Sequence, residues 1–319
     1  MIENNNKLCQ ICVNPIGLAD GVNFHQTESG LVCEHCLDLG QILPPRSYFK
    51  EELDNFLSAR KKVLFGFSGG LDSVIVLCFL KEECQKRDID LEIFSILTGV
   101  KGRVAIENIN KVIDYLELRD NLVFVDIREK VHDSDLILDI FAEPKKTIDL
   151  FLDCYRKMIL PCGELCNSIM DAEYKRIMVE FGHDVLITGG DTPKKNENGQ
   201  YSILWNKKSG ISILRGAYAF GLGKNINRQY IVDNNIPWLD FKWGGYDTNC
   251  LIPGAFFRKK VCGKPDIGLV NTIKMFPIIL DYLSERVRFG VIDREDALGQ
   301  LKKIDIACDA AFSEFNLLL

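Results

Sequence analysis

The chain contains the segment Val63-Leu64-Phe65-Gly66-Phe67-Ser68-Gly69-Gly70-Leu71-Asp72-Ser73-Val74-Ile75-Val76-Leu77. An apolar run comes first, a turn of small residues follows, and a second apolar run has helical spacing. This order is typical of a buried strand, a tight loop and the first turns of a helix. We therefore expect a strand–loop–helix unit at residues 63–77.

The small residues of this turn indicate phosphate binding. Gly69 and Gly70 let the backbone turn sharply and come close to a ligand. Ser68 and Ser73 add hydroxyl donors, and the free N–H groups that begin a helix favour an anion. The turn is not a Walker loop, because no Gly-Lys-Ser/Thr follows the glycines. The alternative is a plain glycine turn capped by Asp72 and Ser73.

The order Ser68-Gly69-Gly70-Leu71-Asp72-Ser73 resembles the SGGxDS signature of the PP-loop ATP pyrophosphatases. The resemblance implies an adenine nucleotide alpha hydrolase-like, Rossmann-like fold. It also implies cleavage of ATP between its α- and β-phosphates, with transfer of AMP to a carbonyl oxygen. By the same resemblance Ser68, Gly69, Gly70 and Ser73 cradle pyrophosphate, Asp72 helps to hold Mg²⁺, and Asp72 and Ser73 act in catalysis.

Strands alternate with helices from residue 63 onward, which indicates an α/β fold with a doubly wound, mostly parallel sheet. A ligand of such a sheet lies beyond the carboxyl ends of the strands. We expect the ends at Gly66–Ser73, Thr98–Arg103 and Thr188–Asp191 to converge on one crevice, which makes Gly189, Gly190 and Asp191 candidate cofactor-binding residues.

The second strand, Leu91–Leu97, supplies further candidates. The PP-loop resemblance implies that Ile96 and Leu97 at its end contact adenine, although apolar residues there fit a hydrophobic core equally well. Arg103, in the loop that follows, is a candidate phosphate ligand, with a solvated arginine as the alternative.

Two CxxC pairs, Cys9/Cys12 and Cys33/Cys36, precede the PP-loop segment. This arrangement commonly presents four thiolates to Zn²⁺, and the alternating residues between the pairs predict the hairpin of a zinc ribbon. A closed four-ligand site has no open position for chemistry, so we expect a structural role. Four unligated thiols and an iron centre are the alternatives.

Three other cysteines, Cys162, Cys166 and Cys250, lie in non-core contexts. Pro161-Cys162, Cys166 and Cys250 resemble the three cysteines with which the PP-loop tRNA thiolases hold a [4Fe–4S] cluster. The resemblance implies metal ligation by all three and a catalytic part for Cys162 and Cys250. The spacing here is CxxxC instead of CxxC, and Cys262 is a candidate substitute ligand. A catalytic persulfide or disulfide pair and unligated thiols are the other readings.

The length of 319 residues allows two domains or one with an appendage. We expect a zinc ribbon at 1–45, a PP-loop domain at 46–260 and a C-terminal helical subdomain at 261–319, with helices over Asp266–Phe289 and Asp293–Phe315 and an N-cap at Asp293.

The composition, with 47% hydrophobic residues and a formal charge of −6, is that of a globular protein. No apolar run approaches the ~18 residues of a membrane span. The start, Met1 to Lys7, lacks the pattern of a secretory signal, so we expect a cytoplasmic protein without membrane partners. The small basic groups fit solvated faces; they are Lys194/Lys195, Lys207/Lys208 and Arg258–Lys260. The negative net charge favours a small-molecule substrate over tRNA.

These patterns favour an ATP-dependent sulfur transferase. ATP would adenylate a substrate carbonyl with release of pyrophosphate, and sulfur from a donor partner, carried on the cluster or a cysteine, would replace the oxygen. The alternative is an amidotransferase resembling the N-acetyl sugar amidotransferases, with ammonia from a partner glutaminase. A non-catalytic nucleotide-binding or zinc-ribbon module is the third hypothesis. Many relatives of these enzymes dimerise, so the resemblance is also compatible with a homodimer.

Overall fold

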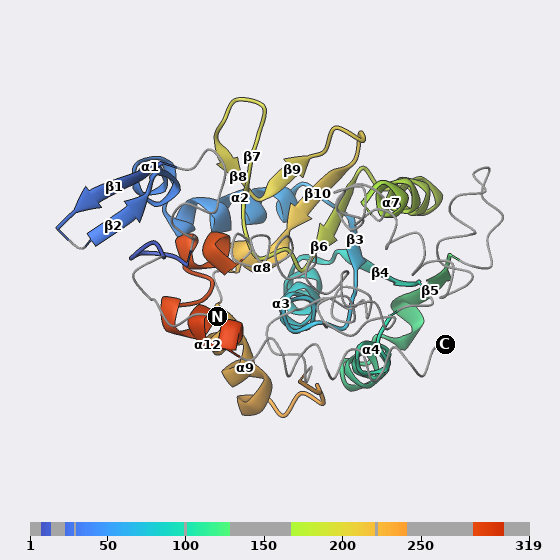
Figure 1. Cartoon of the computed structure of the whole chain (residues 1–319). Helices are drawn as coiled ribbons and strands as arrows, with labels where there is room; N and C mark the ends of the chain where they lie inside the picture. The colour runs from blue at the N-terminus through green and yellow to red at the C-terminus, as the bar shows by residue number, and fades with distance from the viewer. Residues whose placement is uncertain are drawn as a thin grey trace, which may run out of the picture.

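The computed structural model describes residues 8–13, 23–28, 30–98, 101–127, 167–220, 223–240 and 283–302. Its centre is a sheet of six strands in the order β5-β4-β3-β6-β10-β9 (Figure 1). All neighbouring pairs are parallel except β10 with β9, which is antiparallel. The strands are β3 (Lys62–Gly66), β4 (Asp90–Leu97), β5 (Leu122–Asp126), β6 (Val185–Thr188), β9 (Leu204–Asn206) and β10 (Ser212–Arg215).

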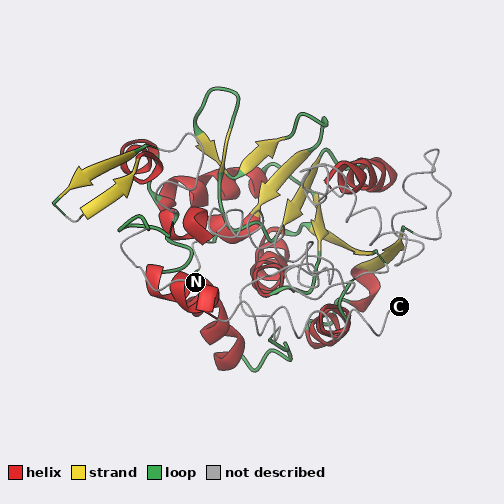
Figure 2. Ribbon diagram, in the orientation of Figure 1, coloured by secondary structure: helices red, strands yellow, loops and turns green. Residues whose placement is uncertain are grey.

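Helices cover both faces of this sheet. Figure 1 shows α3 and α4 on one side and α7 on the other, and Figure 2 separates helices from strands by colour. The helices along the main domain are α2 (Arg46–Ser58), α3 (Leu71–Arg87), α4 (Arg103–Tyr115), a short 3₁₀ turn (Arg119–Asn121), α7 (Asn167–Phe181), α8 (Gly216–Ala219) and α9 (Lys224–Asp233).

The central unit forms for local reasons. Val63, Leu64 and Phe65 of β3 are all buried, as expected for a parallel strand covered on both faces. The chain is extended at Gly70, the N-cap of α3, and the helix then carries Asp72 in its first turn and Lys86 and Arg87 in its last turn. These charges complement the helix dipole. The predicted strand–loop–helix unit is confirmed.

The chain order reverses between β3 and β6. From β3 the chain moves outward to β4 and β5, and it then returns to place β6 and β10 on the other side of β3. Thr188 at the end of β6 pairs with Gly66 at the end of β3. In open α/β sheets this kind of reversal opens a crevice at the carboxyl ends of the two strands. The predicted doubly wound, mostly parallel α/β sheet is confirmed.

A small hairpin stands at the end of the molecule opposite β5 (Figure 1). Strands β1 (Phe24–Thr27) and β2 (Gly30–Cys33) pair antiparallel, and α1 (Glu34–Ile42) follows directly. The hairpin predicted between the two CxxC pairs is therefore present. A second hairpin, β7 (Lys194–Lys195) with β8 (Tyr201–Ser202), rises beside β9.

The described C-terminal residues pack into the main core. Leu283, Phe289, Val291 and Ala297 belong to the same buried apolar cluster as β3 and α3. Residues 283–288 are helical, and α12 (Arg294–Lys302) follows after a break. The Asp293 carboxylate accepts from the Asp296 N–H at 2.6 Å, which confirms the predicted N-cap. The domain boundaries at residues 45 and 260 stay predictions.

None of the helices in the described ranges combines the length and the apolar character that a bilayer crossing requires.

Candidate functional site

The turn between β3 and α3 is closed by its own hydroxyl groups. Ser68 Oγ lies 2.9 Å from Ser73 Oγ and accepts from the Gly70 N–H at 3.3 Å. Ser73 Oγ donates to the Gly70 carbonyl at 2.8 Å. The first N–H groups of α3 have no partner within the helix itself, as at any helix start. These internal hydrogen bonds fix the shape of the turn and place both hydroxyl groups beside the start of α3.

Gly69 has a conformation and surroundings that require glycine. Its φ is +80°, and a Cβ there would collide with the Ala105 carbonyl oxygen at the start of α4. The Gly69 carbonyl accepts from Asn108 Nδ2 at 3.3 Å and from Trp238 Nε1 at 3.1 Å. Segments distant in sequence thus hold the turn in one shape.

The end of β6 lies directly over the start of α3. A Cβ on Gly189 would come within 2.7 Å of the Ser73 nitrogen and 2.8 Å of its Cα. A Cβ on Gly190 would come within 2.8 Å of Arg215 Cζ. The absence of a side chain therefore lets Gly189 pack against the Ser73 backbone and Gly190 against the Arg215 side chain.

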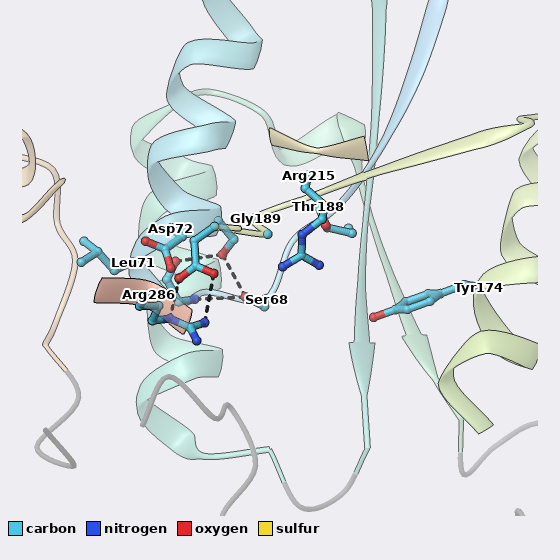
Figure 3. A pocket seen from close by; sticks show the side chains of 13 residues that line it. Ser68, Leu71, Asp72, Tyr174, Thr188, Gly189, Arg215 and Arg286 are labelled. Carbon is cyan, nitrogen blue, oxygen red and sulfur yellow. Dashed lines mark hydrogen bonds and ion pairs between the residues drawn. The ribbon is translucent and has the colours of Figure 1, made fainter. Parts of the chain in front are cut away.

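These segments enclose a cavity of about 250 Å³ (Figure 3). It lies at the carboxyl ends of β3, β6 and β10, at the reversal point of the sheet. The cavity brings together most of the predicted site residues, namely Ser68, Gly70, Asp72, Ser73, Gly189, Gly190 and Asp191. Gly69 belongs to the same β3–α3 turn but does not line the cavity. Tyr174, Arg215 and Arg286 also line it and were not predicted from the sequence.

A network of buried charges forms one side of the cavity. The Asp72 carboxylate pairs with Lys224 Nζ and accepts from Asn227 Nδ2 at 3.0 Å. Asp191 receives both Nε and Nη2 of Arg286, at 2.8 and 3.0 Å, and Lys224 Nζ lies 3.6 Å away. Burial opposes the charge of Asp191, but Arg286, Lys224 and Arg215 together hold the pKa of this carboxyl below its usual value.

Two further side chains point into the cavity from other elements (Figure 3). Arg215, at the end of β10, donates through Nε to the Thr192 carbonyl and through Nη2 to Thr192 Oγ1 at 3.3 Å. Tyr174 comes from α7, and burial raises the pKa of its hydroxyl to about 12, so it is a neutral phenol at pH 7. Arg215, Arg286 and Lys224 against two carboxylates give this site one excess positive charge.

The adenine and phosphate candidates on β4 and its loop lie elsewhere. Ile96 is buried, Leu97 is half-buried and Arg103 is exposed at the start of α4. None of the three belongs to the described residues that line the cavity. Lys101, in the same loop, instead donates to Ser95 Oγ at 3.2 Å, and burial lowers its pKa to about 8. The candidate cluster ligands Cys162, Cys166 and Cys250 lie outside the described residues.

The four N-terminal cysteines form one compact group. All four sulfur atoms lie within 4.8 Å of one another. Three of the pairs are separated by 3.9 Å (Cys9 to Cys36), 3.8 Å (Cys12 to Cys33) and 3.5 Å (Cys33 to Cys36). A metal–sulfur bond of about 2.3 Å corresponds to a tetrahedron edge of roughly 3.8 Å. The group therefore fits a single tetrahedral ion.

Backbone and arginine contacts surround this centre. The Cys33 N–H donates to Cys9 Sγ at 3.4 Å. Arg294 donates to the carbonyls of Cys9 and Cys12, and Arg288 Nη1 lies 4.0 Å from Cys12 Sγ. Hydrogen bonds within the group of thiols lower the pKa of Cys33 to about 7 and raise the pKa of Cys36.

Comparison with known proteins gives weak likenesses. No family model matches the chain. The uncharacterized protein MJ1599 of Methanocaldococcus jannaschii is 24% identical over 303 residues, which span 92% of this chain and 93% of that protein. Among solved structures, the U34-tRNA thiolase NcsA from Methanococcus maripaludis with its [4Fe-4S] cluster is 16% identical, with 96% of this chain and 88% of that chain covered and a TM-score of 0.31. An NH3-dependent NAD synthetase from Campylobacter jejuni is 13% identical, with 75% and 97% covered and a TM-score of 0.27.

Gly189→Ala tests the contact between β6 and α3. The added methyl group meets the Ser73 backbone, so we expect the free energy of unfolding in urea to fall by about 1–3 kcal/mol. Gly299→Ala is the control, because nothing lies within 4 Å of its Cβ and the position is inside α12. That variant should be unchanged or more stable by about 0.4–1 kcal/mol. Equal stability of both variants would contradict the close contact.

Cys9→Ser tests the cysteine centre. Loss of one thiolate from a closed tetrahedral site should reduce bound metal from about one ion per chain to a trace and lower Tm by ~5 °C or more. Metal content by mass spectrometry and thermal unfolding provide the two measurements. Cys84→Ser, at a buried cysteine of α3 outside the group, should keep its metal. A Cys9→Ser protein with normal metal content and Tm would rule out the site.

Proposed function

We propose that the protein is an ATP pyrophosphatase of the PP-loop type, which activates a substrate carbonyl by adenylation. The observation that carries this proposal is the cavity at the reversal point of the sheet. There the Ser68–Ser73 turn, the start of α3 and the Gly189–Asp191 loop meet in one space. The motif predicted the residues of the Ser68–Ser73 turn, and the alternation of strands with helices predicted Gly189–Asp191.

The chemistry of the cavity suits a polyphosphate. Gly70, Leu71, Asp72 and Ser73 line it at the start of α3, where the positive end of the helix dipole favours an anion. Arg215 and Arg286 add guanidinium groups, which match phosphate oxygens in geometry. These donors are held in place before a ligand arrives, and such preorganised donors stabilise the charge that develops on a leaving pyrophosphate.

Mg²⁺ would bind at the carboxylates of this site. Asp72 and Asp191 are the two carboxylates among the described lining residues, and Mg²⁺ takes carboxylate and phosphate oxygens together. Lys224 lies between the two and pairs with both. A divalent ion and Lys224 would thus share the same negative charges. When bound, the ion would neutralise phosphate charge during the displacement.

The proposed reaction has two displacements. The carbonyl oxygen of the substrate attacks the α-phosphorus of ATP, the bond to the bridging oxygen breaks, and pyrophosphate leaves with that electron pair. A sulfide sulfur then adds to the activated carbon, and AMP departs with the former carbonyl oxygen, so that C=S replaces C=O. In the alternative reaction ammonia adds instead and loses protons to water, which yields an amide or amidine.

We favour sulfur because of the sequence pattern of Cys162, Cys166 and Cys250, which supplies candidate ligands for a [4Fe–4S] cluster. The compact N-terminal group, in contrast, suits one Zn²⁺ ion with a structural role. The acceptor is proposed to be a small molecule, and the protein is proposed to act in the cytoplasm, where free thiols persist.

Asp72→Asn tests the pyrophosphatase assignment. The variant keeps the shape of the side chain but removes its charge, so AMP and pyrophosphate formation from ATP should fall about 10²-fold or more. The acceptor is supplied as a low-molecular-weight metabolite extract and, in a parallel reaction, as bulk tRNA. Asp120→Asn, at an exposed position, should keep full activity. Formation of ADP and phosphate, or full activity of Asp72→Asn, would contradict the proposal, and turnover with tRNA alone would assign a different acceptor.

The iron and acid-labile sulfide content of the purified protein distinguishes the sulfur-transfer reaction from the alternative reaction with ammonia. After anaerobic purification we expect about four iron and four sulfide per chain, with the visible absorption of a cluster. Cys162→Ser should lose both, whereas Cys78→Ser, at a buried cysteine of α3, should keep them. Zinc without iron in protein never exposed to air would instead support amide formation.

A further inference from the structure

The structure has a second cavity, of about 270 Å³. Its walls come from α1, from the β7–β8 hairpin with Pro193 before it, and from residues 285–289, which are far apart in the sequence. Two segments contribute residues to both cavities. Asp191 and Arg286 line the first cavity, whereas Lys194 and Arg288, each a few residues further along the chain, line the second.

The second cavity is positively charged. Lys194, Lys195 and Arg288 line it, and Glu285 is the one carboxylate among its described lining residues. Glu285 pairs with Lys194 at 2.8 Å, so the charge of that lysine is balanced locally. Two positive charges are thus in excess. Lys195 is exposed, as the sequence suggested for the Lys194/Lys195 pair, and both lysines also border this open cavity.

An aromatic wall adjoins these cations. The Tyr201 and Phe289 rings pack edge to face with centroids 5.5 Å apart, and Lys195 Nζ lies 5.4 Å from the Tyr201 centroid. Burial raises the pKa of the Tyr201 hydroxyl, and Arg288 opposes that shift. The tyrosine is therefore a neutral donor close to Arg288. A cavity with cations on one side and aromatic rings on another suits a molecule with an anionic end and an apolar or planar body.

The cysteine centre helps to build this cavity. His35 lies between the ligands Cys33 and Cys36 and lines the cavity. Arg288 contacts both the cavity and Cys12 Sγ. The ribbon therefore positions two polar groups of the second cavity, in addition to stabilising its own hairpin.

We propose that the second cavity binds the acceptor substrate by an anionic group, a phosphate or a carboxylate, next to the nucleotide cavity. This inference rests on the proposed adenylation chemistry, which needs two ligands in adjoining sites. The first cavity has the glycine turn and the start of α3, which suit a triphosphate, whereas no glycine is among the described residues that line the second. Its excess of two positive charges selects an acidic acceptor, and its volume suits a small molecule.

The test is anion binding to the full, metal-loaded chain by calorimetry. The nucleotide cavity is first saturated with Mg²⁺ and α,β-methylene ATP, whose α–β linkage cannot be cleaved. Inorganic phosphate and succinate are then titrated separately, which distinguishes a phosphate from a carboxylate ligand. Lys195→Gln and Arg288→Gln should each weaken binding of the preferred anion by about tenfold. Lys208→Gln, which removes the same charge from an exposed lysine outside the cavity, should not.

Lys195 is exposed, so its substitution leaves the fold intact even where Arg288→Gln disturbs the ribbon. The proposal would be overturned if neither anion bound saturably, or if Lys195→Gln bound the preferred anion as tightly as the unsubstituted protein. Ser73→Ala should weaken binding of the ATP analogue alone. If the protein binds phosphate through Lys195 but does not bind the ATP analogue, the adenylation chemistry is refuted while the second binding site stands. The failure of the proposed function can therefore be told apart from the failure of this inference.

Discussion

The structure depends on how the buried carboxylate of Asp191 is paired. A charge taken out of water is costly unless opposite charges and hydrogen-bond donors surround it. Arg286 binds it with two nitrogens, and Lys224 links it to Asp72 at the start of α3. Four segments, the starts of α3 and α9, the loop after β6 and residues 283–288, are thus joined by one network. Removal of any member would leave an uncompensated charge in the wall of the cavity.

The local part of this site was predictable from the sequence, and the long-range part was not. The glycine turn, the strand before it and the cysteine pairs each lie within a few residues, where spacing reports geometry directly. Lys224 and Arg286 pair with carboxylates 152 and 95 residues away. No periodicity encodes a partner at that distance. The same reason applies to Lys194, which pairs with Glu285 at 2.8 Å, because that partner lies 91 residues further along the chain.

The N-terminal ribbon is held to the main domain by the C-terminal residues. Arg294 binds the carbonyls of Cys9 and Cys12, Arg288 lies against Cys12 Sγ, and Arg46 of α2 donates to the Gly290 carbonyl at 2.9 Å. Peptide carbonyls at a metal-binding turn carry partial negative charge, so guanidinium groups suit them well. The two ends of the described chain therefore meet at the metal centre, and the folding of each supports the other.

The helical residues 285–288 contribute to both cavities. Within one helical turn Arg286 holds Asp191 in the first cavity, while Glu285 and Arg288 face the second. A helix moves as a unit, because its backbone hydrogen bonds resist independent displacement of neighbouring residues. A ligand that displaced residues 285–288 in one cavity would therefore move side chains of the other, and by thermodynamic linkage such an effect is reciprocal. Under the proposed function, an acidic acceptor in the second cavity and a nucleotide in the first would be linked through this single turn of helix.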